Sequence, residues 1–208
     1  SKMLKSPQLE GFHSHKLNVL LLSDPIDHFW VSQVYSYKDR PFKSVTEEDL
    51  NLNTEKSGDS HLKSLIEFLE KHFQGKVKKV RISTRLKESP VCFVSSRQGQ
   101  NFYLTGFIQE KQNTLTRILE INPNHQLIQN LLSLIETEGT KKSLEEMADL
   151  LYDQALILEG LPVTDSQLFA QRLTSLMRSQ LNAVKRTVVN SIYRIIGEYD
   201  GQISQYTY

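Results

Sequence analysis

The sequence predicts an α+β protein: a small α/β unit, then a mixed-sheet domain that ends in a pair of helices. Two observations support this class. Apolar runs of strand length alternate with helix-spaced apolar residues up to about residue 122, and only helix-spaced patterns follow. Polar and small residues at 46–60 separate two organised blocks. We therefore predict the end of one domain at 1–57, a second domain at 58–177 and an additional tail at 178–208.

The first block reads as a strand followed by a helix. Residues 17–23 contain an uninterrupted apolar run, which is typical of a buried strand. Asp24 can cap the helix that follows, and Pro25 suits its first turn because the missing N–H has no partner there. Apolar residues then recur at helical spacing: Ile26, Phe29, Trp30 and Val34.

The second block opens with an amphipathic helix over 62–73, which Gly75 ends. Three strands are predicted at 77–83, 91–95 and 115–121. Helices follow: one opened by Asn122 and Pro123, one by a capping box at 143–146 (SLEE), and one by a second capping box at 164–167 (TDSQ). The apolar spacing continues over 180–196, which predicts an amphipathic helix in the tail.

Composition excludes several classes of protein. The 208 residues carry a net charge of +1, so there is no basic excess of the kind that polyanion binders show. The single cysteine, Cys92, excludes a disulfide framework and lies in an apolar run that favours the core. No apolar run reaches the ~18 residues that span a bilayer. We expect a soluble, cytoplasmic protein that binds neither nucleic acid nor membrane.

No constellation for catalysis is present. The sequence lacks both the GxxxxGK[ST] and GxGxxG phosphate loops and the HExxH zinc motif, so we predict no catalytic, cofactor-binding or metal-ligating residue. His13 and His15 form the one close histidine pair, and the lack of further ligands nearby favours an exposed loop. The basic residues at 76–88 have no interleaved aromatic, which argues against single-stranded nucleic acid.

Charge is nevertheless segregated along the chain. Residues 61–88 are mainly basic, 136–159 are mainly acidic, and 171–196 carry basic charges only. Solvated surfaces are the simplest interpretation. For the basic tail we expect docking onto the acidic region of a dimer, with an anionic membrane surface or disorder as the alternatives.

Two features suggest interaction surfaces. Leu104, Phe107 and Ile108 form an apolar stripe in an irregular connection between strands, where such a stripe is either core or a loosely packed contact surface. The last two capped helices carry more apolar residues than one hairpin can bury, so a second copy would complete a four-helix bundle. The predicted dimer contacts are Leu150, Leu151, Leu158, Phe169, Leu173, Leu176 and Met177.

Six ordered motifs carry a resemblance. They are 6–10 (SPQLE), 20–27 (LLLSDPID), 40–45 (RPFKSV), 77–90 (VKKVRISTRL with SP at 89–90), 119–125 (LEINPNH) and 150–156 (LLYDQAL). In this order they resemble the C-terminal third of the ninety-kilodalton heat-shock protein chaperones, in particular the bacterial HtpG type. The resemblance runs from about Ser6 to Met177.

The resemblance implies a homodimeric chaperone that contacts unfolded or partly folded client proteins. It implies that ATP and Mg²⁺ are used by the full-length protein and bound outside this chain, which would have no catalysis of its own. It suggests client contacts at Phe29 and Trp30, together with Leu104, Phe107 and Ile108. Packing of Trp30 in the core is the alternative for that residue. The chain ends in QYTY rather than MEEVD, so no tetratricopeptide co-chaperone is expected. The alternative is a purely structural dimerisation module in which the stripe at 104–108 is core.

Overall fold

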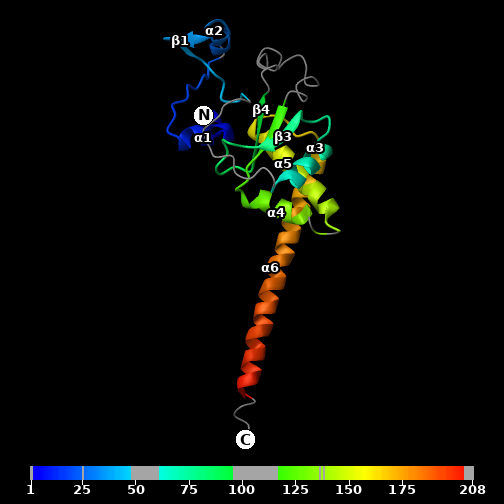
Figure 1. Ribbon diagram of the computed structural model, residues 1–208. Helices are drawn as coiled ribbons and strands as arrows, with labels where there is room; N and C mark the ends of the chain where they lie inside the picture. The colour runs from blue at the N-terminus through cyan, green and yellow to red at the C-terminus, as the bar shows by residue number, and fades with distance from the viewer. Residues whose placement is uncertain are drawn as a thin grey trace. The chain divides into compact units, whose positions relative to one another are not determined.

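The computed structural model describes residues 2–24, 26–47, 61–95, 117–135, 137 and 139–203. The chain divides into two compact units, residues 1–162 and 163–208, and each is described by itself (Figure 1). Helices and small sheets occur together in the first unit, which confirms the predicted α+β class.

A three-stranded mixed sheet organises the first unit. It consists of β3 (Lys79–Ile82), β4 (Val91–Ser95) and β5 (Arg117–Ile121) in the order β3-β5-β4. β5 runs parallel to β3 and antiparallel to β4. The predicted strands are present, and β4 has the predicted bounds. β5 therefore supplies the central strand, although it comes last in the sequence.

Three helices cover one face of this sheet: α3 (Lys63–His72), α4 (Gln126–Ile135) and α5 (Lys141–Leu158) (Figure 1). Val80, Leu119 and Phe93 are register neighbours on that face. With the apolar residues of the three helices they form the main buried core. Because side chains alternate along a strand, the residues between them point to the opposite face.

The opposite face carries a small apolar cluster and a group of buried charges. Leu86, Cys92, Val94 and Ile118 make up the cluster. The N-terminal segment packs against β4 on this unit and comprises η1 (Lys2–Lys5), η2 (Pro7–Leu9) and α1 (Glu10–Ser14). The amide of Gln8 donates to the carbonyl of Phe93 at 3.0 Å, which fixes this segment to the sheet.

The predicted strand at 17–23 is wrong. These residues form no regular element, and the side chain of Leu20 is 64% exposed. A strand needs a ladder partner to satisfy its backbone groups. The nearest strands in the described part of the chain, β1 (Ser36–Tyr37) and β2 (Arg40–Pro41), pair with each other as a short hairpin. The helix predicted after residue 25 is present as α2 (Asp27–Gln33) and precedes this hairpin, which the sequence did not predict.

The helices end at the predicted glycines, but neither of the two predicted capping boxes forms as expected. Gly75, Gly139 and Gly160 adopt φ values of +75° to +82°, a region that suits glycine at helix ends. α5 begins at Lys141 without a side-chain cap, so Ser143 lies inside the helix and its predicted capping box is wrong. At the next helix, the carboxylate of Asp165 rather than Thr164 accepts the N–H of Leu168 at 2.9 Å.

The second unit is one continuous helix, α6 (Ser166–Ile203). The sequence suggested a hairpin helix followed by a separate tail helix. No glycine or proline lies between Met177 and Leu181, so nothing interrupts the backbone hydrogen bonds there. The described residues of the tail, 178–203, continue the same helix.

Candidate functional site

The turn that opens α2 is held by two aspartates. The carboxylate of Asp24 accepts the N–H of Ile26 at 3.1 Å, and that of Asp27 accepts the N–H of Asp24 at 2.9 Å. Both bonds order the turn that precedes α2. The N-cap residue of α2 is Ile26, without a side-chain cap bond. Asp24 therefore shapes this turn from two residues before the cap position that the sequence assigned to it.

Asp27 also fixes the only tryptophan of the chain. The other carboxylate oxygen, Oδ1, accepts the indole N–H of Trp30 at 2.9 Å. The Trp30 ring meets Phe42 edge to face, with ring centroids 5.9 Å apart. Trp30 is half-buried, so it is neither a deep core residue nor a fully exposed one.

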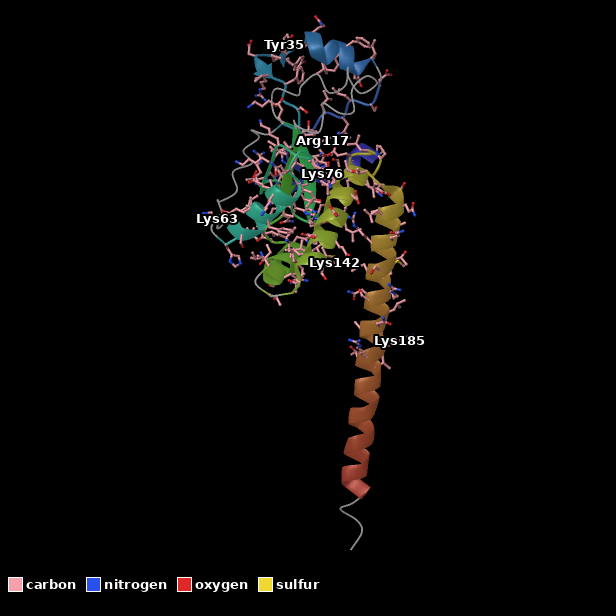
Figure 2. All side chains as sticks on the ribbon, turned by 90° about the vertical axis from the view of Figure 1, so that its right-hand side faces the viewer. Tyr35, Lys63, Lys76, Arg117, Lys142 and Lys185 are labelled. Atoms are coloured by element: carbon pink, nitrogen blue, oxygen red, sulfur yellow. The ribbon has the colours of Figure 1, made fainter. Side chains whose placement is uncertain are left out.

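Around Trp30, α2 and the hairpin segment that follows it carry several exposed aromatic side chains. Phe29 is 62% exposed, Tyr35 76%, Tyr37 63% and Phe42 39%. Figure 2 labels Tyr35 beside α2 and the hairpin. We call these four residues, with Trp30, the aromatic surface. Large rings with few rotatable bonds can bind apolar segments of a partner at low entropic cost. The sequence pointed to Phe29 and Trp30 but missed Tyr35 and Tyr37.

The other predicted client contacts, Leu104, Phe107 and Ile108, lie outside the described residues. They stay predictions.

The predicted dimer contacts on α5 differ in burial. Leu151 is 3% exposed and belongs to the main core of its own protomer, so it has almost no surface to offer a partner. It shares the sheet-facing side of α5 with Ala148 and Ala155. Leu150 is half-buried, and Leu158 at the helix end is 43% exposed. Of the three, Leu158 has the most surface available.

The predicted contacts on α6 retain more surface. Phe169 and Leu176 are half-buried, whereas Leu173 is 40% and Met177 60% exposed. Two further exposed apolar side chains, Ile157 at 50% and Leu168 at 39%, were not among the predicted contacts. Exposed apolar side chains therefore occur at the end of α5 in the first unit and, separately, along α6 in the second unit.

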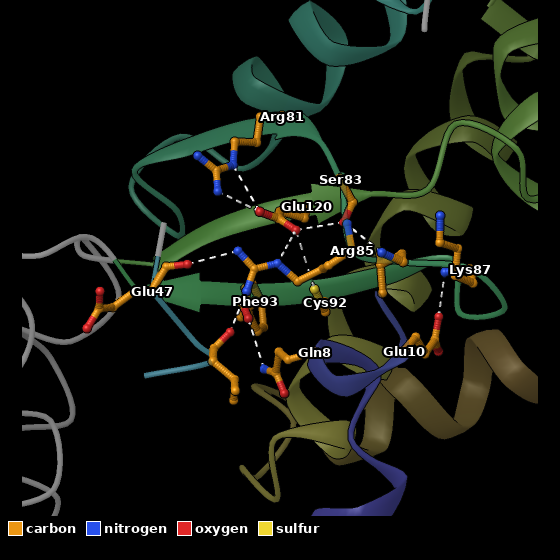
Figure 3. A network of polar contacts seen from close by, with 12 residues as sticks. Gln8, Glu10, Glu47, Arg81, Ser83, Arg85, Lys87, Cys92, Phe93 and Glu120 are labelled. Carbon is orange, nitrogen blue, oxygen red and sulfur yellow. Dashed lines mark hydrogen bonds and ion pairs between the residues drawn. The ribbon is translucent and has the colours of Figure 1, made fainter. Parts of the chain in front are cut away.

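A buried ion network lies on the second face of the sheet (Figure 3). Nε of Arg85 lies 3.0 Å from Oε2 of Glu120, and both side chains are 1% exposed. Arg81 donates to Oε1 of the same carboxylate at 2.6 Å, and the Ser83 hydroxyl donates to Oε2 at 2.7 Å. The strand register explains why Arg81 reaches Glu120, because Arg81 and Cys92 are the direct neighbours of Glu120 on the flanking strands.

Arg85 also contacts the segment that follows the hairpin. Arg85 donates from its terminal nitrogens to the carbonyls of Val45 and Glu47, the latter at 2.8 Å. The sequence suggested only a weak possibility of phosphate contacts for this basic stretch. A usable signal was present in Glu120, a lone acid in the apolar run of β5, since a buried carboxylate requires a partner.

A second carboxylate ties the N-terminal segment to the loop before β4. Glu10 accepts the N–H groups of Lys87 at 2.7 Å and Glu88 at 2.8 Å, and it also accepts from Ser89. Burial by itself would raise the pKa of Glu10. The hydrogen bonds from the Ser89 hydroxyl and from these backbone N–H groups outweigh burial and lower that pKa below 4.5.

Within the described ranges, no group of three or more His, Cys, Asp or Glu side chains could hold a metal ion. None of the helices in those ranges is long and apolar enough to cross a membrane. His13 and His15 are exposed at the end of α1, and Cys92 is 2% exposed.

Comparison with known proteins decides the family. A family model described as Hsp90 protein matches residues 1–196. The chain belongs to the Hsp90 family. The match passes the end that the six motifs suggested at Met177, so this Hsp90 chain resembles its family along most of α6 as well.

Curated relatives agree with this assignment. A chaperone protein HtpG of Paramagnetospirillum magneticum is 40% identical over 195 residues, covering 86% of this chain and 31% of the relative. Proteins of the same name from Wolbachia of Brugia malayi and from Rickettsia rickettsii (Sheila Smith) are 35% and 34% identical. They cover 83% and 86% of this chain, and 30% and 31% of their own lengths. The chain therefore spans about a third of the length of the HtpG relatives it matches.

Proposed function

We propose that this chain is the homodimerisation and client-contact part of an HtpG-type chaperone. The observation that carries the proposal is the presence, in an Hsp90-family chain, of two separate sets of exposed apolar side chains. One is the aromatic surface on α2 and the hairpin. The other lies at the end of α5 and along α6.

The second set supports the dimer. Leu158, Leu173 and Met177 expose apolar area that folding of one chain leaves in water. Burying a leucine side chain contributes about 1.5–3 kcal/mol, and two-fold symmetry counts each contact twice. We propose that two copies bury this set in a four-helix bundle formed by α5 and the first turns of α6.

Solution mass tests the dimer. Light scattering at micromolar concentration should give about twice the 24.0 kDa chain mass. Leu173→Glu/Leu176→Glu should shift the protein to monomer, because charge would enter the proposed contact. Ser175→Glu/Ser179→Glu adds the same charge to exposed positions of the same helix and should leave the dimer intact. A monomeric parent protein, or equal effects of the two double variants, would contradict the proposal.

The aromatic surface supports the client contact. Four of its rings are exposed, and the half-buried Trp30 is held by Asp27 and Phe42. The apolar segments of an unfolded client would therefore meet aromatic rings that are already ordered. The runner-up function is a purely structural dimerisation module in which residues 104–108 are ordinary core. In either case we propose that ATP and Mg²⁺ act in other parts of the chaperone, and we assign no residue here to them.

Binding of a permanently unfolded, dye-labelled chain separates the two functions. Phe29→Ser/Tyr37→Ser should weaken binding by about tenfold, measured by fluorescence anisotropy. Leu104→Ser/Phe107→Ser tests the predicted stripe in the same way. Leu20→Ser removes an apolar side chain of 64% exposure outside both sets and is the matched control. Equal affinity for all variants and the parent would favour the structural module.

A further inference from the structure

The connection between β3 and β4, residues 83–90, is bonded to the chain at two places distant in sequence (Figure 3). Glu10 of α1 accepts three successive backbone N–H groups of this connection, those of residues 87–89. Arg85, which belongs to the connection, donates to two backbone carbonyls in the segment 45–47. One short connection is therefore bonded both before and after the part of the chain that contains α2 and the hairpin.

Residues 15–44 lie between these two contacts, and we call them the α2 block. They include every member of the aromatic surface. Neither of the two apolar clusters described above contains a residue of this block. Leu17 and Leu20, two of its apolar side chains, are 48% and 64% exposed. Within the described residues, the α2 block is thus attached to the rest of the first unit by polar contacts at its ends rather than by a share of the apolar core.

The connection is itself fixed to the central strand of the sheet. The side-chain amide of Asn122, directly after β5, donates to the carbonyls of Lys87 at 3.2 Å and Ser89 at 3.0 Å. At the other end of the connection, the Ser83 hydroxyl donates to the Glu120 carboxylate of β5 at 2.7 Å. These bonds hold an irregular segment in place, so a group that is bonded to the connection is also held relative to the sheet.

We propose that residues 83–90 form a two-point anchor that sets the orientation of the aromatic surface relative to the sheet, with Glu10 and Arg85 as positioning residues. This inference rests on the proposed client contact, because it concerns how the same surface is presented. The side chain of Arg85 is 1% exposed, so it has no surface with which to touch a client. It acts through the backbone of residues 45–47.

The chemistry of Arg85 suits this role. Hydrogen bonds are directional and can fix an orientation, whereas the burial of apolar area is not directional. The guanidinium is planar and presents its N–H donors in a rigid arrangement. Its Nε faces Glu120, and its terminal nitrogens donate to the carbonyls of residues 45 and 47. Arg85 therefore holds the far end of the α2 block in a defined orientation relative to β5.

The fluorescence of Trp30 tests the anchor, because Trp30 is the only tryptophan and its ring is held within the α2 block. In the parent protein, time-resolved anisotropy should decay with the rotation of the whole molecule. Glu10→Ala and Arg85→Met/Glu120→Leu should each add a faster decay on the nanosecond timescale, since the block then moves by itself. The double substitution avoids an unpaired buried carboxylate. Glu67→Ala removes an exposed carboxylate from α3 and is the matched control, which should retain the parent decay.

Cys92 reports separately on the sheet, because this thiol is 2% exposed within the apolar cluster there. It should stay unreactive toward a thiol reagent in both anchor variants, while their dissociation constants for a labelled unfolded chain rise by about threefold or more.

An unchanged Trp30 decay in both anchor variants overturns the anchor and leaves the proposed client contact standing. A faster decay accompanied by a reactive thiol also overturns it, because the sheet has then unfolded rather than released the block. A parent protein that binds no unfolded chain overturns the proposed client contact, whereas the Trp30 decay still decides whether the anchor holds the block.

Discussion

Nε of Arg85 faces Oε2 of Glu120 across 3.0 Å in the interior of the protein, where each side chain is 1% exposed. The guanidinium also donates to two backbone carbonyls, at Val45 and Glu47. One side chain therefore joins the segment after the hairpin to the central strand of the sheet. The consequences of removing it follow from the cost of leaving a charge buried.

Arg85→Met should destabilise the protein by about 3–5 kcal/mol, because it leaves Glu120 with one cationic partner fewer in a buried site. Urea unfolding measures the loss. Arg85→Met/Glu120→Leu removes both charges and should recover much of it, since Arg81 is 26% exposed and can turn to water. A single variant as stable as the double variant would show that the pair contributes little.

Glu10→Gln should lower stability by about 1 kcal/mol at pH 7, a value reduced for partial exposure. The pKa of Glu10 is lowered in the folded state, so its contribution is fully present above about 4.5 and is lost as pH falls through the lower folded value. The difference in stability between the parent and the variant should therefore shrink as the pH falls below 4.5. Urea midpoints at pH 7 and at pH 3.5 provide the comparison, and an equal difference at both would contradict this assignment.

Asp27→Ala should move the fluorescence of Trp30 toward that of an exposed indole and destabilise α2 by about 1 kcal/mol. The substitution removes the acceptor of the indole N–H and the acceptor of the Asp24 N–H. Trp30 is the only tryptophan, so the emission reports on this site alone. Asp27→Asn keeps an acceptor and should show a smaller change. Identical spectra for all three proteins would mean that Asp27 does not hold the ring.

Cys92 should not react with a thiol reagent at pH 8 while the protein is folded. Burial, reinforced by the Glu120 carboxylate, raises the pKa of this thiol well above its ordinary value, and only the thiolate is reactive. Absorbance after addition of an aromatic disulfide reagent should rise only when urea unfolds the chain. Rapid reaction of the native protein would place Cys92 at the surface.

Local patterns predicted the local parts of this fold. The helix-ending glycines and the strand at Val91–Ser95 depend on a few neighbouring residues, which the sequence displays directly. The apolar run at 17–23 led to an incorrect strand prediction. A strand forms only beside a second strand, and one segment of sequence does not show whether that second strand exists.

The ion network and the aromatic surface could be identified only once the fold was known. Arg85, Glu120 and Val45 are far apart in the chain and meet only because β5 inserts between β3 and β4. Tyr35 and Tyr37 gave no periodic signal, since a short hairpin rather than a helix presents them. Leu151 was assigned to the dimer because a helix pattern shows which residues are apolar but not which of them the chain buries by itself.

The strand order also governs when the sheet can form during synthesis. β3 and β4 are not adjacent, so within the described residues each has its ladder partner in β5 alone. A growing chain must therefore reach Ile121 before either earlier strand can pair in this sheet. Nascent chains that stop before Arg117 should expose unpaired strand edges, which is the form of the polypeptide most prone to aggregate.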